Sequence, residues 1–137
     1  MGDPAHRTCL EKQMAGYLIE IGLDFSEQYA LRSGSILDFV VQFKRPDGSL
    51  FSIDVETDGS EWHHTKSQRM RDLMRDKNTR SLGMEVVRFR EGFNLHQVYG
   101  SLLQVARRNG VVEFPPFPGG SGDNMVWSGR VWSGEVR

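Results

Sequence analysis

Acidic residues occur at two places in the sequence that are expected to come together when the chain folds. Asp38 lies in the middle of the apolar run 36–41, Glu56 lies near the end of the run 50–57, and Asp58 follows it. A carboxylate that is buried without a partner costs free energy, so Asp38 is expected to have one. Asp58 precedes a glycine, and on its own it could equally be a turn former.

A turn signal joins these two runs into a predicted hairpin. Arg45-Pro46-Asp47-Gly48 has the composition of a tight turn, in which proline presets φ and glycine closes the bend. Pairing across this turn places Asp38 opposite residues 55–57, within the ~5 Å of direct partners or the ~7 Å of diagonal ones. Alternation along the strand puts Glu56 on the face opposite residues 51, 53 and 55. Asp38 and Glu56 are therefore predicted to converge, with Asp58 close by.

Carboxylates at this separation favour a divalent cation. They repel one another and raise each other's pKa unless a cation lies between them. Hard oxygen ligands suit Mg²⁺ or Mn²⁺ rather than zinc, and the single cysteine, Cys9, excludes a cysteine-rich zinc site. A cation held there could polarise a phosphodiester and lower the pKa of the attacking water. The acidic residues thus predict a magnesium site suited to phosphodiester chemistry.

An aromatic and histidine-containing segment follows the acidic run. Trp62, His63 and His64 come shortly after Asp58. Histidine exchanges protons near neutral pH, so His63 is the first candidate for a proton carrier and His64 the second. Trp62 is expected either to pack in the core or to press against a base. The alternative for both histidines is a loop position with no chemical role.

Basic residues dominate the next stretch, although the whole chain has a net charge of −1. The stretch 63–90 contains Lys66, Arg69, Arg71, Arg75, Lys77, Arg80, Arg88 and Arg90 against Asp72, Asp76 and Glu85. A basic flank of this kind suits a nucleic-acid partner, and Lys66, Arg69 and Arg75, together with Trp62, are the predicted DNA contacts. The alternative is a solvated helix on which Asp72 and Asp76 form ion pairs with the arginines.

The apolar periodicity predicts an α/β domain with the order α-β-β-β-α-β-α. Helices are expected at 6–22, 66–82 and 94–108, and strands at 25–31, 36–43, 50–57 and 84–89. In the helix at 66–82, Met70, Leu73, Met74 and Leu82 are expected to form the inner face. A hairpin followed by a strand-helix-strand crossover predicts a mixed central sheet flanked by helices.

The domain is predicted to cover residues 5–109, with a tail at 110–137. The tail contains prolines, a glycine-rich stretch and two copies of Val-Trp-Ser-Gly at 126–134. It is expected to be flexible to about residue 124, after which the repeat either docks on the domain or meets a partner, such as a second copy of the chain. No apolar run approaches the roughly 20 residues of a membrane helix, and the polar start predicts a cytoplasmic protein.

From Glu11 to about residue 108 the chain resembles the Vsr-like branch of the PD-(D/E)XK nuclease superfamily, which contains the very short patch repair endonucleases and related homing endonucleases. The matching stretches are, in order, Glu11-x-x-Met14 with Leu18, the run 36–41, the run 54–63, Arg71-Asp72-x-x-Arg75-Asp76 and the run 82–89. The resemblance implies a restriction-endonuclease-like α-β-β-β-α-β core. It also implies Mg²⁺-dependent hydrolysis of DNA.

The resemblance also implies roles for the acidic residues. Asp38 would be the central metal ligand, and Glu56 and Asp58 would fill the signature on the following strand. The main-chain carbonyl of Thr57 would be a further ligand, and Glu11 would approach from the first helix.

His63 would carry the proton in this scheme, with Asp72 or Asp76 as its support. Two departures qualify the resemblance. The lysine usual in the superfamily is absent, because Asp58 stands in its place, and the cysteine and histidine zinc site of the repair enzymes is also missing. The sequence therefore predicts a Mg²⁺-dependent DNA endonuclease and gives no support for mismatch-repair specificity. The alternative is a catalytically inactive module of the same fold that binds DNA or a protein partner.

Overall fold

A computed structural model describes residues 8–59 and 65–119 of the chain. Within these ranges the elements are α1 (Cys9–Ile21), β1 (Asp24–Ala30), β2 (Ile36–Lys44), β3 (Leu50–Asp58), α2 (Lys66–Ser81), β4 (Glu85–Arg90) and α3 (Leu95–Arg108). The predicted α/β class and the order α-β-β-β-α-β-α are both confirmed. Apolar periodicity located each element because its pattern changes at each turn.

The strands form one mixed sheet in the order β1-β2-β3-β4. β1, β2 and β3 are antiparallel neighbours, whereas β4 returns through α2 to lie parallel to β3. In the hairpin, Phe39 pairs with Val55 and Lys44 with Leu50. Gly48 has a φ of 90° in the connecting turn, a conformation that glycine adopts without strain. This register brings Asp38 to the level of Glu56.

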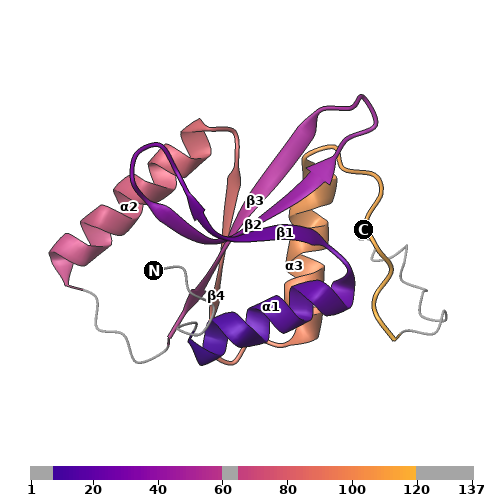
Figure 1. The fold of residues 1–137 in the computed structure, drawn as a ribbon, viewed down its shortest axis with the longest axis horizontal. Coiled ribbons are helices and arrows are strands. Elements are labelled where there is room, and N and C mark those ends of the chain that lie inside the picture. Colours follow the sequence, from indigo (N-terminus) through magenta and orange to yellow (C-terminus); the bar gives the residue numbers. More distant parts are fainter. Residues whose placement is uncertain (1–7, 60–64, 120–137) are drawn as a thin grey trace.

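The two faces of the sheet are covered differently (Figure 1). α1 and α3 lie on one face and α2 lies on the other. Alternate residues of the central strands, including Phe39, Val41, Ile53 and Val55, are buried in the same core as the apolar side chains of α1 and α3. Each fully buried side chain of this size contributes about 2 kcal/mol, so this layer supplies most of the hydrophobic stabilisation.

Each helix begins at a complete capping box. The pairs of N-cap and third helical residues are Thr8 with Glu11, Thr65 with Gln68, and Asn94 with Gln97. In each pair the two side chains satisfy backbone N–H groups that the helix itself leaves free. These local signals explain why the helix starts agree with the sequence to within a few residues at α2 and α3.

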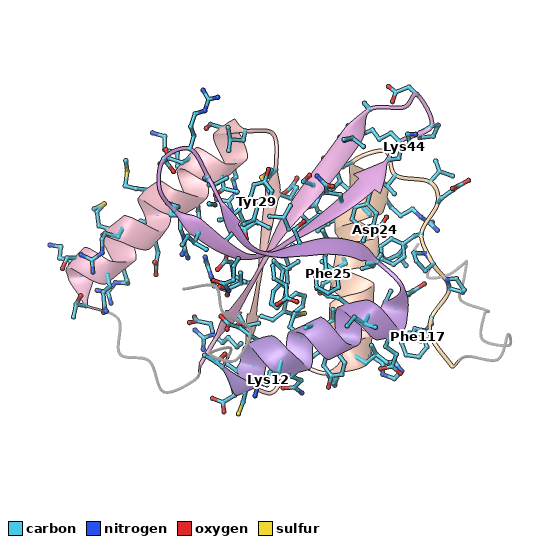
Figure 2. The ribbon with its side chains drawn as sticks, in the orientation of Figure 1. Lys12, Asp24, Phe25, Tyr29, Lys44 and Phe117 are labelled. Atoms are coloured by element: carbon cyan, nitrogen blue, oxygen red, sulfur yellow. The ribbon has the colours of Figure 1, made fainter. Side chains whose placement is uncertain are left out.

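The predicted inner face of α2 is wrong. Met70, Leu73, Met74 and Leu82 are between 51% and 62% exposed. In Figure 2, side chains of α2 project away from the sheet. The helix instead turns polar residues inward, and its buried members are Asp76 and Thr79. The reason is the sheet surface beneath α2, which carries acidic side chains and Arg88. Polar side chains of the helix pack against this charged surface, so its apolar side chains face the solvent.

The segment after α3 packs against the domain over residues 111–117. Val111 is buried, and Phe114 and Phe117 (labelled in Figure 2) pack against the core. The Tyr99 hydroxyl donates to the carbonyl of Pro115 at 2.6 Å. The expectation of a flexible tail beginning at residue 110 is therefore wrong for this stretch. The repeat at 126–134 lies outside the described residues.

Within residues 8–59 and 65–119, no helix is both long and apolar enough to cross a bilayer.

Candidate functional site

The carboxyl groups of Asp38 and Glu56 meet between β2 and β3. The backbone N–H of Asp38 donates to Glu56 Oε2 at 3.4 Å, and the N–H of Thr57 donates to Asp38 Oδ2 at 3.3 Å. Each carboxyl group therefore reaches the backbone of the opposite strand. This arrangement confirms the predicted convergence of Asp38 and Glu56, and it places both groups on the sheet face that α2 overlies.

Burial changes the protonation of these acids. Glu56 is only 4% exposed, and Asp38 is partly buried. Burial, followed by the nearby charge of Glu56, raises the pKa of Asp38 to about 7. Burial, followed by a side-chain hydrogen bond with Asp54, raises the pKa of Glu56 to about 8. Both groups are thus partly protonated near neutral pH in the metal-free protein, and a cation placed between them would favour their ionised forms.

Asp54 is a member of this acidic group that was absent from the predicted site. It lies two residues before Glu56 on the same face of β3 and is 1% exposed. No N–H or hydroxyl donor among the described residues reaches its carboxylate oxygens, and its side-chain partner is the carboxyl group of Glu56. Burial raises its pKa as well. The available signal was its alternation with Glu56, but its burial follows from α2, whose position the sequence did not reveal.

Two arginines supply positive charge to this face. Arg88 of β4 binds Asp76 of α2 through two hydrogen bonds, of 3.2 and 3.1 Å. The Arg75 Nη2 atom lies 3.8 Å from Glu56 Oε1 and 3.9 Å from Asp72 Oδ1. α2 is therefore attached to the sheet by ion pairs. The predicted alternative was a solvated helix on which both aspartates pair with its own arginines. It holds for Asp72 and Arg75, whereas Asp76 is buried and pairs with Arg88 of β4.

Two further predicted ligands lie in β3 and α1, and within the described residues they form no metal-binding group of three with the acidic pair. Asp58 ends β3, and its carbonyl accepts a hydrogen bond from the Glu91 N–H at 2.8 Å. Glu11 Oε1 accepts from the Thr8 N–H at 3.0 Å as part of the α1 cap, and the charge of Glu11 also contributes to the raised pKa of Asp38. Glu11 therefore has a structural role of its own.

The remaining predicted residues fall into two groups. Trp62, His63 and His64 lie outside the described residues, so their proposed roles stay predictions. Lys66 and Arg69 are exposed near the start of α2. Their contact with DNA, like that of Arg75, also stays a prediction.

The acidic pair could hold a hard divalent cation. Mg²⁺ in proteins is usually bound by one or two carboxylates and keeps several waters. Asp38 and Glu56 could supply these two carboxylates. No group of three or more His, Cys, Asp or Glu side chains within residues 8–59 and 65–119 is placed to hold a metal ion. Asp54 adds a third carboxyl group beside Glu56 on the same face of β3.

The fold and the site together define a mixed α/β domain with a largely buried acidic pair on the sheet face beneath a basic helix. Comparisons of the chain with protein-family models, with curated proteins and with solved structures find no match.

Proposed function

We propose that this protein is a Mg²⁺-dependent DNA endonuclease of the Vsr-like kind. The observation that supports the proposal best is the contact between Asp38 and Glu56 across the hairpin, in a setting that raises the pKa of both. Two such carboxyl groups, buried on one sheet face, form a site whose charge is balanced by a divalent cation. Mn²⁺ would serve in place of Mg²⁺, since both take oxygen ligands.

Asp38 and Glu56 would hold the cation through their carboxylates. Asp58, at the end of the same strand, and the carbonyl of Thr57 would be further oxygen donors. A cation in this site would polarise the scissile phosphodiester and lower the pKa of the attacking water. With no lysine after Glu56, His63 is the candidate that accepts the proton of that water.

The outer surface of α2 would hold the DNA backbone. The exposed basic side chains of the helix include Lys66, Arg69, Arg71, Lys77 and Arg80. Its two aspartates form ion pairs, Asp72 with Arg75 and Asp76 with Arg88. Exposed positive charge therefore outweighs negative charge on the solvent side of the helix, whereas Asp76 is buried against the sheet. Contacts from such a surface to phosphates would position the DNA without reading its sequence.

The test is incubation of the protein with supercoiled plasmid in the presence of Mg²⁺ or Mn²⁺. The wild-type protein is expected to convert the plasmid to the nicked form, because a single acidic site cuts one strand at a time. Asp38→Asn should lower the rate by at least about 100-fold, the order of loss seen when one transition-state stabilising group is removed. Asp24→Asn, an exposed carboxyl on β1, is the matched control and should cut like wild type.

The alternative is a catalytically inactive module that binds DNA. The absence of a three-residue metal-binding group within the described ranges is the observation that favours it. Retained binding of plasmid, with no nicked product in either metal, would select this alternative and reject the endonuclease.

A further inference from the structure

We propose that Arg75 is the internal counter-ion of the acidic site, that it competes with the divalent cation for Glu56, and that its guanidinium passes to Asp54 when the cation binds. This inference rests on the proposed function, because it concerns the same acidic face. It gives Arg75 a role different from that of the exposed arginines of α2.

The first observation is the position of the guanidinium. Arg75 lies beside Glu56 and Asp72, but both distances, 3.8 and 3.9 Å, exceed those of a hydrogen bond. The side chain of Arg75 is 30% exposed and that of Glu56 is 5% exposed, so the pair is only partly screened by water. Arg75 also acts electrostatically on Asp54 and on Glu56, lowering the pKa of each against the effect of burial. Its charge thus serves several acids without being fixed to one.

The second observation concerns Arg75 Nε and the carboxyl group of Asp54. The Nε atom of Arg75 is buried and has no hydrogen-bond partner among the described residues, and neither carboxylate oxygen of Asp54 accepts from an N–H or hydroxyl donor there. The side chain that Asp54 does meet is the carboxyl group of Glu56. A divalent cation bound by Glu56 would remove that partner, and a buried acceptor left unpaired costs free energy. Arg75, whose charge already acts on Asp54, is then the donor that can satisfy it.

The third observation excludes the other nearby cation. Arg88 is held by two hydrogen bonds to Asp76, at 3.2 and 3.1 Å, and a bidentate pair of this kind fixes the guanidinium plane. Arg88 therefore attaches α2 to the sheet, and Arg75 is the arginine that can change its acidic partner. A divalent cation between Asp38 and Glu56 would neutralise the charge of Glu56 in place of Arg75. The guanidinium of Arg75 would then be free to pair with Asp54.

The test measures binding of Mn²⁺ alone, without DNA, by titration calorimetry and by the rise in melting temperature. Arg75→Met removes the competing charge, so it should bind Mn²⁺ about three- to tenfold more tightly than wild type. Its metal-free form should melt at a lower temperature, since the acids lose their counter-ion. Arg75→Lys keeps the charge and should bind Mn²⁺ like wild type. Arg71→Met, an exposed cation on the same helix, is the matched control and should change the affinity less than twofold.

Asp54→Asn tests the second half of the proposal. In the wild-type background it should weaken Mn²⁺ binding, because the released Arg75 then meets a neutral amide in place of a carboxylate. In the Arg75→Met background the loss should be smaller. If Asp54 acts by its charge alone, the loss will be larger without Arg75 than with it, and the transfer to Asp54 is rejected.

The remaining outcomes are also decisive. Unchanged or weaker Mn²⁺ binding by Arg75→Met overturns the role of counter-ion, and so does an equal gain from Arg71→Met. If Arg75→Met does not fold, Arg75→Gln carries the same expectation. A wild-type protein that binds no Mn²⁺ rejects the proposed function together with this inference. A wild-type protein that binds Mn²⁺, but whose affinity does not depend on Arg75, rejects this inference alone.

Discussion

At the scale of single residues, the protein concentrates carboxyl groups where water is scarce. Asp38 and Glu56 contact each other's strands, and Asp54 lies buried beside them. Their raised pKa values mean that the folded, metal-free protein binds protons that the unfolded chain releases. The free energy of unfolding should therefore depend on pH.

This dependence has a definite sign. Asp38 titrates near 3.8 in the unfolded chain and near 7 in the folded protein, and Glu56 titrates near 4.5 and 8. The stability of the metal-free protein should thus be highest, as far as these groups are concerned, below pH 4 and should fall until about pH 8. Asp38→Asn, which keeps an acceptor for the Thr57 N–H, should melt higher than wild type at pH 8, by about 1–3 kcal/mol in the free energy of unfolding.

The check is a pair of melting curves at pH 4.5 and pH 8 without metal. The difference between Asp38→Asn and wild type should fall to about a quarter at pH 4.5, since this pH is only slightly above the unfolded pKa of 3.8. Asp24→Asn, the exposed control, should show no gain at either pH. A variant that is no more stable than wild type at pH 8 would show that burial and the neighbouring acids do not disfavour the ionised form of Asp38 in the folded protein.

At the scale of elements, sequence reasoning worked where local signals decide the outcome. Strand alternation and a four-residue turn predicted that Asp38 meets Glu56. The orientation of α2 was not predictable in the same way. Met70, Leu73 and Met74 have the spacing of an inner face, but the charged sheet surface beneath the helix prevails over that pattern. The burial of Asp54 depends on α2 and was missed for the same reason.

The polar attachment of α2 predicts low local stability. α2 rests on ion pairs and has few buried side chains, whereas α3 buries Val98, Leu102 and Val105. Amide hydrogens of α2 should exchange at least about tenfold faster than those of α3. Raising the salt concentration to about 0.5 M should accelerate exchange in α2 more than in α3, because salt weakens ion pairs. Equal protection of the two helices, measured by mass spectrometry, would contradict this expectation.

At the scale of the whole molecule, the segment after α3 ties distant parts of the chain together. Phe114 stacks on Phe43 of β2, with ring centroids 5.6 Å apart, and meets the edge of Tyr99 at 5.3 Å. Arg45 in the hairpin turn donates from Nε to the carbonyl of Asn109 at 2.6 Å. The segment after α3 therefore packs against the core beside the hairpin and connects the hairpin to α3.

Phe114→Ala should consequently lower the free energy of unfolding by about 2–4 kcal/mol, the usual cost of removing a packed aromatic side chain. Val112→Ala, only two residues away but 63% exposed, should stay within about 0.5 kcal/mol of wild type. Chemical denaturation of the two variants makes the comparison. Similar stabilities would mean that the segment is not part of the folded core.

The outward apolar residues of α2 also determine how the protein responds to oxidants. Met70 and Met74 are 56% and 51% exposed, whereas Met14 is completely buried. Peroxide converts methionine to a polar sulfoxide at a rate that depends on access. Mild treatment should therefore modify Met70 and Met74 well before Met14, as peptide mass spectrometry would show, and the fold should survive. A helix that turned these methionines inward would lose its packing on oxidation. In this protein the methionines that oxidants reach first are not part of the core, so their oxidation should leave the packing unchanged.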